Sequence, residues 1–253
     1  MRTHTDGRAM VRLDGVTKAR AQGESVFELV VPDFAVHAGE VVAVVGPSGC
    51  GKSTLLDMIA LVMMPSSVRR FEIDAGATGG MVDVRRLWVQ GDEAALAALR
   101  RDHLGYVLQT GGLLPFLSVR DNIGLPGRIK GLRQDRPRID RLARRLGLQG
   151  CLDRMPASLS IGQRQRAAIL RALAHRPRLV LADEPTAAVD KARARSIIDD
   201  MEALARDESV AVVVVTHDVE LVVGRADRIY TFDLEQVSDQ ATRSFCRQVG
   251  RAG

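Results

Sequence analysis

The chain has 253 residues, of which 46% are hydrophobic and 26% charged, and a formal net charge of +5. This composition excludes a disordered or fibrous chain, and the length suits one α/β domain or two small domains, of which we expect one. The longest apolar runs, 41–45 and 210–215, are far shorter than the roughly 18 residues that a membrane helix requires. No apolar stretch follows the charged N-terminal residues, so we expect no signal sequence and a cytosolic protein.

The thiols and the basic residues carry no specific functional signal. Cys50, Cys151 and Cys246 lack metal-ligand spacing and are expected to stay reduced. Nearly all of the 36 basic residues are arginines spread along the chain, which favours a solvated surface over a functional basic patch. Only 4% of the residues are aromatic, which leaves little surface for stacking single-stranded nucleic acid.

The first part of the chain predicts short strands at 10–13 and 26–31. A buried strand follows at 40–45, because that run is apolar, continuous and rich in β-branched residues. A glycine-rich loop then leads into a helix at 52–61. The segment 66–92 has no clear period and is expected to be an irregular β excursion.

The rest of the chain predicts a parallel α/β core that is interrupted by helices. A helix at 94–101 and a strand at 104–108 precede Gln109, and 119–177 is expected to be an all-helical insertion with prolines between its helices. Strand patterns return after the insertion, with two helices between them. The strands are 179–182, 210–215 and 228–232, and the helices are 191–206 and 217–225.

The sharpest signal is a phosphate-binding loop between the strand at 40–45 and the helix at 52–61. Its residues fit the pattern G-x-x-x-x-G-K-[ST] and are Gly46, Pro47, Ser48, Gly49, Cys50, Gly51, Lys52 and Ser53, with Thr54 next on the helix. Glycines let backbone N–H groups surround phosphate oxygens without Cβ clashes, and the N-terminus of the helix attracts negative charge. Lys52 then neutralises the β- and γ-phosphates, and the Ser53 hydroxyl takes a Mg²⁺ coordination position.

Two carboxylates directly follow the apolar strand at 179–182, where an open α/β sheet presents its ligand crevice. We expect Asp183 to hold Mg²⁺ through water and Glu184 to act as the general base on the attacking water. The alternative is a solvated acidic cap on the next helix, and the phosphate-binding loop disfavours it.

Two further polar positions are ambiguous when each is taken alone. Ser160 is expected to cap a predicted helix. The start of that helix is either a second anion site or only the capped end of a helix. His217 follows the strand at 210–215, where its side chain either reaches a bound phosphate or serves only the structure.

Together these motifs resemble those of an ATP-binding cassette (ABC) ATPase over roughly residues 11–232. Five motifs occur in the order of that family: the Walker A loop at 46–53, the Q-loop residue Gln109, the signature helix at 159–163, Walker B at 179–184 and the switch histidine His217. The resemblance implies that Gln109 contacts Mg²⁺ and couples the attacking-water region to the helical insertion. It also implies that Asp190 closes a D-loop at 187–190.

The resemblance further implies a shared site. Ser160 and Gly162, with Gln163 beside them, would contact the γ-phosphate of ATP held by a second copy of the chain. Each ATP would then join two cassettes, and hydrolysis would loosen their interface. ATP and Mg²⁺ are the expected cofactors, and ATP hydrolysis by a homodimer is the expected activity.

The implied fold is a P-loop NTPase ABC cassette of the α/β class. It has a RecA-like parallel-sheet core, an N-terminal antiparallel β subdomain and a helical subdomain inserted at about 110–176. We expect a single domain over 9–235 and a short C-terminal tail at 236–253.

The implied partner is a separate integral membrane permease, which would hold the chain at the inner face of the cell membrane. The docking groove of the family lies near the Q-loop, where this chain has apolar residues at 113–119 that alternatively pack the helical insertion. The same stretch resembles the lipoprotein-releasing and macrolide-export branch. An importer ATPase, a soluble non-transport ABC ATPase acting on nucleic acid and a nucleotide-dependent module with weak turnover stay open, although no stable nucleic-acid partner is expected.

Three features depart from the family pattern. Ile161 replaces the first glycine of the signature, and Arg20 stands where an aromatic residue usually stacks on adenine, so the guanidinium either covers the base or is simply solvated. The interval between Lys52 and Gln109 is about ten residues longer than is usual, mostly within 66–92. That excursion is expected to be either a partner contact or a tolerated surface loop.

Overall fold

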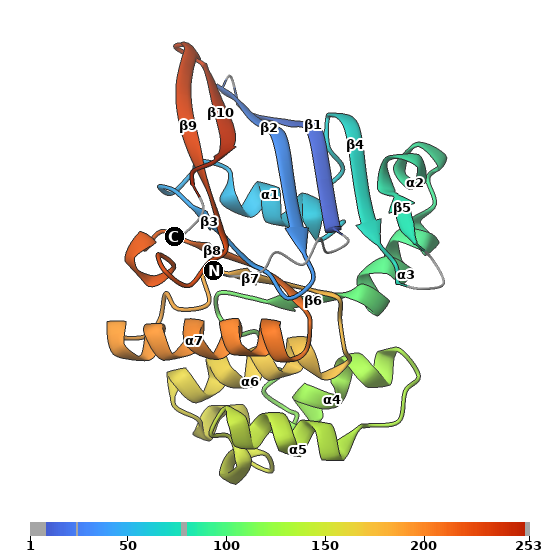
Figure 1. Ribbon diagram of the computed structural model, residues 1–253, viewed down its shortest axis with the longest axis vertical. Helices are drawn as coiled ribbons and strands as arrows, with labels where there is room; N and C mark the ends of the chain where they lie inside the picture. The colour runs from blue at the N-terminus through green and yellow to red at the C-terminus, as the bar shows by residue number, and fades with distance from the viewer. Residues whose placement is uncertain (1–8, 24, 77–79, 251–253) are drawn as a thin grey trace.

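A mixed sheet organises the chain (Figure 1). The computed structural model describes residues 9–23, 25–76 and 80–250. Within these ranges the sheet has ten strands, which lie side by side in the order β5-β4-β1-β2-β10-β9-β3-β8-β7-β6. The strands are β1 Ala9–Gln22, β2 Ser25–His37, β3 Val41–Val45, β4 Ser67–Asp74, β5 Met81–Asp83, β6 Leu104–Val107, β7 Leu179–Asp183, β8 Ala211–Thr216, β9 Arg228–Ser238 and β10 Ala241–Gln248.

Helices cover the sheet and form a separate layer at one end of the molecule (Figure 1). The α-helices are α1 Lys52–Ile59, α2 Val84–Gln90, α3 Glu93–His103, α4 Val119–Ile129, α5 Arg136–Arg145, α6 Ile161–Ala174 and α7 Lys191–Asp207. The 3₁₀ helices are η1 Gln149–Cys151, η2 Pro156–Ser158 and η3 Val219–Leu221. Over the described ranges, none of these helices is both long enough and apolar enough to span a membrane.

The parallel half of the sheet consists of β3, β8, β7 and β6, as the sequence predicts for a RecA-like core. Every residue of β3 and of β8 is buried. Because helices or other strands cover both faces of a parallel sheet, a continuous apolar run suits such strands better than an alternating one. The carboxyl ends of these strands meet at one edge, and the segments that begin at Gly46, Glu184 and His217 leave from that edge.

The antiparallel half contains β1, β2, β4 and β5 and shares an apolar core with α1. Strand β1 pairs with β2 on one side and with β4 on the other. The core joins Leu13 and Phe34 of these strands to Leu55 and Leu56 of α1. Helix α1 is therefore held by both halves of the sheet, which fixes the loop that precedes it.

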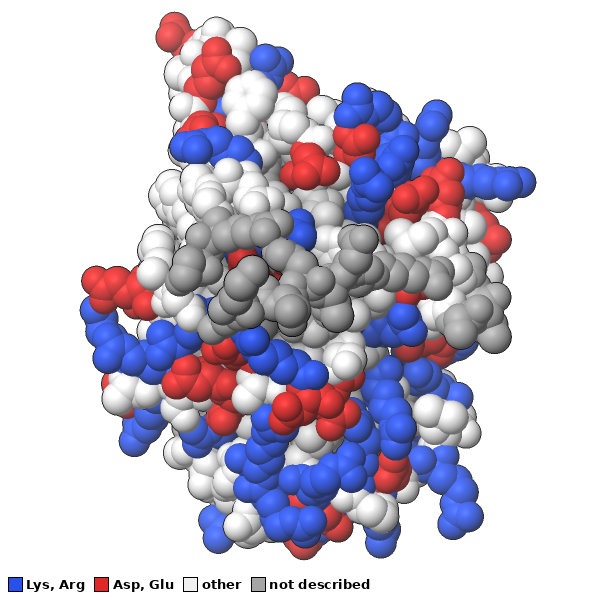
Figure 2. Space-filling view, viewed as in Figure 1, with Lys and Arg blue, Asp and Glu red and all other residues white. Residues whose placement is uncertain are grey.

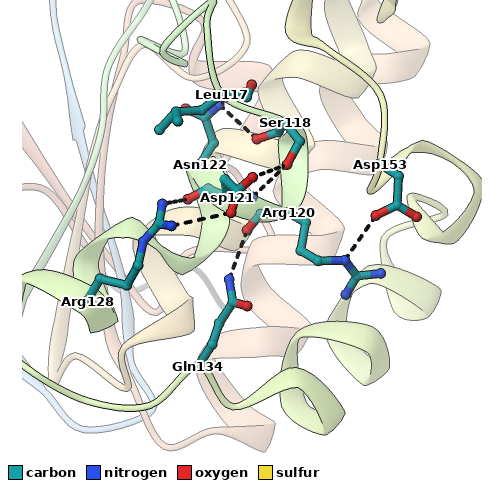
Figure 3. Close-up of polar contacts among 8 residues, drawn as sticks. All are labelled: Leu117, Ser118, Arg120, Asp121, Asn122, Arg128, Gln134 and Asp153. Carbon is teal, nitrogen blue, oxygen red and sulfur yellow. Dashed lines mark hydrogen bonds and ion pairs between the residues drawn. The ribbon is translucent and has the colours of Figure 1, made fainter.

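The predicted helical insertion contains α4, α5 and α6. A buried side chain, Asn122, holds the loop before α4 in place (Figure 3). Its Nδ2 donates to the carbonyl oxygens of Leu114, Leu117 and Ser118, each at 3.0 Å, and its Oδ1 accepts the Leu114 N–H at 2.7 Å. The loop within 113–119 is therefore rigid, and it presents Phe116 with 71% of its surface exposed.

Lys and Arg side chains are numerous over the lower part of the face shown in Figure 2, and Asp and Glu side chains lie among them. Several arginines of the described part of the chain, most of them exposed or half-exposed, are paired with carboxylates. The pairs include Arg138 with Glu208 at 2.5 Å, Arg145 with Asp207 at 2.5 Å and Arg120 with Asp140 at 2.8 Å. The surface is mixed in charge, which agrees with the solvated surface that the sequence favours.

Two segments differ from their predicted structure. Residues 66–92 form β4, β5 and α2 rather than an irregular β excursion, and the Trp88 ring of α2 lies edge-on to Phe71 with ring centroids 5.2 Å apart. The helix predicted at 217–225 is wrong, because the single 3₁₀ turn η3 forms there instead. Both differences arise from tertiary packing, which the local periodicity does not report.

The described part of the expected C-terminal tail, residues 236–250, consists mostly of strands, and residues 251–253 lie outside the described ranges. Strand β9 continues to Ser238, and β10 follows it, pairing antiparallel with β9 and parallel with β2. Ser244 and Cys246 of β10 are 0% and 1% exposed. The domain therefore extends to at least Gln248, because the buried face of β10 belongs to the core of the sheet.

The contact between β6 and α6 leaves no room for a side chain at Gly105. A Cβ at this position would lie 2.3 Å from the backbone oxygen of Ala172. We expect Gly105→Ala to lower the free energy of unfolding by about 3 kcal/mol, because backbone on both sides must move. Urea unfolding monitored by circular dichroism measures this change.

Gly127→Ala is the matched control. Gly127 lies inside α4, and a Cβ there would meet no atom within 4 Å. Alanine should therefore stabilise the helix by about 0.5–1 kcal/mol. Equal effects of the two substitutions would contradict the close β6–α6 contact.

Candidate functional site

The loop between β3 and α1 has a backbone that only glycine allows at several positions. Gly49 and Gly51 have φ angles of +80° and +105°. A Cβ on Gly46 would lie 2.8 Å from the Cys50 sulfur and 3.1 Å from the Phe232 ring. Ser244 of β10 also donates its hydroxyl to the Cys50 carbonyl oxygen at 2.7 Å. The turn is therefore held by its own glycines and by the C-terminal strands.

Lys52 begins α1 and lies over this loop. Its side chain is buried, and Nζ donates to the carbonyl oxygens of Gly46 and Pro47, both at 2.8 Å. Backbone N–H groups at the start of α1 face the same region, with Ser53 exposed and Thr54 buried behind it. A cation beside the N–H groups of a helix start suits a bound phosphate.

The two predicted carboxylates and the predicted histidine converge at the adjoining strand ends. Asp183 ends β7, and Glu184 follows with a φ angle of +43° while its N–H donates to Val215 at 3.0 Å. The Glu184 Oε2 lies 3.4 Å from Nδ1 of His217, which follows β8. The unusual backbone at Glu184 thus aims its carboxylate at the end of the neighbouring strand.

Asp183 lies close to Ser53 and to other acidic groups. Burial raises the pKa of its carboxyl group, Glu184 and Asp57 raise it further, and Lys52 and the Ser53 hydroxyl oppose them. In the described ranges, no group of three or more His, Cys, Asp and Glu side chains is placed to hold a metal. A Ser53 hydroxyl with one carboxylate nearby still fits Mg²⁺, which takes few protein ligands and completes its shell with water and phosphate.

Gln109 lies apart from these residues. It follows β6 in an exposed turn, in which the Gly111 N–H donates to the Leu108 oxygen at 2.8 Å. It does not line the cavity around the phosphate-binding loop. The smaller hollow that both Glu184 and His217 line does not include Gln109 either.

The signature residues also lie apart from that cavity, at the start of α6. Ser160 and Gln163 cap this helix reciprocally, with the Gln163 N–H 3.2 Å from the Ser160 hydroxyl and the Ser160 N–H 2.9 Å from Oε1 of Gln163. Ile161 is 48% exposed, and a Cβ on Gly162 would lie 3.8 Å from the Arg193 side chain. This end of α6 is open to solvent beside the start of α7.

Asp190 caps α7, next to the signature residues. It accepts the Arg193 N–H at 3.0 Å and pairs with the Arg193 guanidinium at 3.0 Å. These contacts hold the pKa of its carboxyl group below the usual range, with the bond from the Arg193 backbone as the main cause. Asp190 and Ser160 therefore belong to one exposed surface rather than to the phosphate loop.

A cavity of about 880 Å³ connects the phosphate-binding loop to β1, β2 and the β9–β10 hairpin. Glu184 lines it, as do Arg20 and Phe27. The hairpin contributes Leu234, Gln236, Asp239, Gln240 and Thr242. The sequence motifs predict a role for neither Phe27 nor the hairpin. Two short strand-like runs on either side of residue 239 are the signal that the sequence holds for the hairpin.

The sequence model of the ABC transporter family matches residues 30–187. The chain belongs to the ABC transporter family. The cassette is 40% identical to the lipoprotein-releasing system ATP-binding protein LolD 1 of Rhodospirillum rubrum, over 88% of this chain and 95% of that protein. It is 37% identical to the macrolide export ATP-binding/permease protein MacB 1 of Aeromonas hydrophila, over 87% of this chain and 32% of that protein.

The cassette also resembles solved structures. The dimeric structure of MJ0796, described as a bacterial ABC transporter cassette, aligns with a TM-score of 0.75 and 31% identity, over 96% of this chain and 99% of that chain. A dimeric post-hydrolysis state of MJ0796 bound to ADP and Pi aligns equally well. The predicted ABC cassette fold is confirmed, and the chain is an ATP-hydrolysing cassette.

A second hollow of the cassette, of about 260 Å³, lies where α3, β6, α4 and α6 meet. Ile129 of α4 lines it and is 65% exposed, whereas His175 at the end of α6 is 6% exposed. The His175 Nε2 lies 3.0 Å from the Leu104 carbonyl oxygen, which identifies it as the protonated nitrogen. Burial lowers the pKa of His175 to about 4, with only partial opposition from that bond.

His175 should make the stability of the cassette depend on pH. Its pKa falls from 6.5 in the unfolded chain to about 4 in the folded one, so the unfolded chain binds the proton first on acidification. Stability is therefore complete above pH 6.5 and decreases as the pH falls toward 4, by up to about 3 kcal/mol. His175→Gln keeps an N–H donor and cannot titrate in this range, so urea unfolding of this variant should lack that part of the pH dependence. Identical pH profiles for the two proteins would contradict the assignment.

Proposed function

We propose that the cassette is the ATP-hydrolysing subunit of a lipoprotein-releasing or macrolide-export type of membrane complex, and that it works as a homodimer around two Mg-ATP. One observation carries the proposal. Lys52 and Glu184 line the cavity at the phosphate loop, and His217 lies 3.4 Å from Glu184. Ser160 and Gly162 do not line that cavity and lie at the exposed start of α6. One chain then supplies half of each site, and a second copy supplies the other half.

Each group around the phosphate loop has a role that its position supports. Lys52 neutralises the β- and γ-phosphates, and the loop N–H groups donate to their oxygens. Glu184 accepts the proton of the attacking water, and His217, 3.4 Å from its carboxylate, orients that water and the γ-phosphate. The Glu184 side chain is 20% exposed, so neighbouring atoms restrict its motion and keep its carboxylate directed at the strand end.

Ser53 and Asp183 would hold Mg²⁺ beside the phosphates, Asp183 through water. The ion supplies positive charge that offsets the charge of the β- and γ-phosphate oxygens. Gln109 is proposed to join this group when its exposed turn approaches the cavity, which would couple the nucleotide to the helical insertion.

The exposed start of α6, with Ser160 and Gly162, would complete the ATP site of the second copy. Ser160 supplies a hydroxyl and Gly162 an N–H group at the start of a 14-residue helix, and Gln163 holds Ser160 in place through the reciprocal capping bonds. Asp190, at the start of α7, would contact the partner copy across the same surface. Ile161 is exposed at this seam, where its branched side chain replaces a glycine of the family pattern.

Glu184→Gln should trap the closed dimer. The variant retains the phosphate loop and Lys52, but it lacks the base, so turnover should fall by at least about 100-fold while ATP still binds. Size-exclusion chromatography with light scattering in saturating Mg-ATP should show a dimer. Lys52→Ala is the control, because it should bind no ATP and stay monomeric. A monomeric Glu184→Gln protein that binds ATP would contradict the shared site.

The membrane partner is proposed from the relatives and from the surface of the insertion. MacB 1 carries an ATP-binding and a permease part in one protein, and this chain matches about a third of it. A separate permease subunit would supply the rest. The hollow that Ile129 lines lies between the helical insertion and the elements α3 and β6, and the loop that presents Phe116 lies on the insertion. Both expose apolar surface that a docked segment would cover.

Ile129→Glu should release this partner. Affinity purification of the tagged cassette from detergent-solubilised membranes should recover an integral membrane subunit with a large domain outside the bilayer, and the variant should lose it because a charge enters an apolar contact. Val89→Glu is the control, since Val89 is 74% exposed on α2, outside the insertion. Recovery of a compact permease with a solute-binding protein would replace the proposal with import.

A further inference from the structure

The end of the cavity that β2 and the β9–β10 hairpin form is partly apolar, although phosphate chemistry needs no apolar surface there. Phe27 lines it, and so do Val26 and Leu234, which are 42% and 51% exposed. Exposed apolar side chains that meet in one concavity favour a ligand with an aromatic or apolar part. A nucleobase is the apolar part of a nucleoside triphosphate.

Four strands place a row of side chains along this end of the cavity. Arg20 of β1 pairs with Phe27 of β2, Phe27 pairs with Thr242 of β10, and Thr242 pairs with Gln236 of β9. Residues that pair in register lie on the same face of a sheet, so these four side chains form one row. The row spans three strand spacings, or about 14 Å. All four residues line the cavity.

The row begins directly beside the phosphate loop. A Cβ on Gly51 would lie 3.3 Å from the Phe27 ring and 3.1 Å from Leu29. Among the residues that line the cavity, Phe27 is the one with an aromatic ring, so a nucleotide whose phosphates lie on the loop has this ring within the same cavity. Arg20 is the cross-strand neighbour of Phe27 and has no ring itself.

The hairpin part of the row is fixed relative to the loop. Arg243 of β10 pairs with Glu28 of β2 at 2.6 Å, and the Val26 N–H donates to the Gln240 carbonyl oxygen at 2.7 Å. Within the row, the Thr242 hydroxyl donates to Oε1 of Gln236 at 3.1 Å. Because the hairpin is also tied to the loop through Ser244, it forms a preorganised wall rather than a loose extension.

We infer that Phe27 and the β9–β10 hairpin form the nucleobase site of this cassette, with a purine base stacked on the Phe27 ring and enclosed by Leu234, Gln236 and Thr242. The stacking surface lies on β2, and the C-terminal hairpin supplies the second wall. This inference rests on the proposed function, because it concerns the base of the same ATP. It makes the hairpin a determinant of nucleotide affinity.

Two variants and two ligands test the inference by calorimetric measurement of Kd. Phe27→Leu removes the ring and keeps an apolar side chain, so the Kd for Mg-ATP should rise about tenfold, as for loss of a base-stacking aromatic. The double variant Leu234→Ala, Gln236→Ala should raise the Kd for Mg-ATP about fivefold through loss of the hairpin wall. The Kd for inorganic tripolyphosphate should stay unchanged in both variants, because tripolyphosphate has no base.

Val237→Ala is the matched control on the hairpin. Val237 is adjacent to Gln236 on β9, so it points to the opposite face, and it is 51% exposed. Its Kd values should equal those of the wild type. The double variant alters only exposed side chains of the hairpin, so it should fold. The test therefore still gives a result if Phe27→Leu unfolds the protein.

The outcomes separate this inference from the proposed function. Wild-type affinity for Mg-ATP in both folded variants would overturn the inference and leave ATP hydrolysis intact. An equal loss of affinity for Mg-ATP and tripolyphosphate would also overturn it, because it would mean that these residues support the phosphate loop. A wild-type protein that binds neither ligand would instead contradict the proposed function.

Discussion

The close approach of backbone within the phosphate loop is the constraint on which the rest of the site depends. A side chain on Gly46 would collide with Cys50 and Phe232, and Gly51 lies against Phe27 and Leu29. These contacts come from β2 and β9 as well as from the loop itself. The loop therefore keeps its N–H groups directed at one point only while the sheet around it is intact. Lys52 can then hold its ammonium group beside the same point without a large loss of side-chain entropy on binding.

The same sheet brings charges together that would repel one another in a flexible chain. Asp183 and Glu184 are adjacent, and burial together with Glu184 raises the pKa of the Asp183 carboxyl group. Lys52 and Ser53 oppose that effect, so the acidic pair depends on the phosphate loop for its charge balance. The lysine and serine of the phosphate-binding loop and the two carboxylates are thus parts of one electrostatic arrangement. A change in any one of them alters the others, which is how nucleotide state can act on the positions of the surrounding elements.

Much of this arrangement could be predicted because its residues are contiguous in the chain. The loop from Gly46 to Ser53, the strand that ends at Asp183 and the strand before His217 each have a local pattern with one structural solution. The predictions failed where the pattern is weak or the partner is distant. Strand β10 has a mixed polar sequence, and it becomes a strand because β2 and β9 lie on either side of it. Helix α2 likewise depends on the contact of Trp88 with Phe71.

The sequence by itself determined the family, the strands of the parallel core and the phosphate-binding loop, because short motifs encode backbone geometry locally. Only the tertiary structure decided that Gln109 and Ser160 do not line the cavity at the phosphate loop in a single copy, and that Phe27 and Gln236 lie in one row. The row joins residues about two hundred positions apart in the chain, and it does so through strand pairing. Register between distant strands follows from burial of the whole sheet, which no local pattern contains.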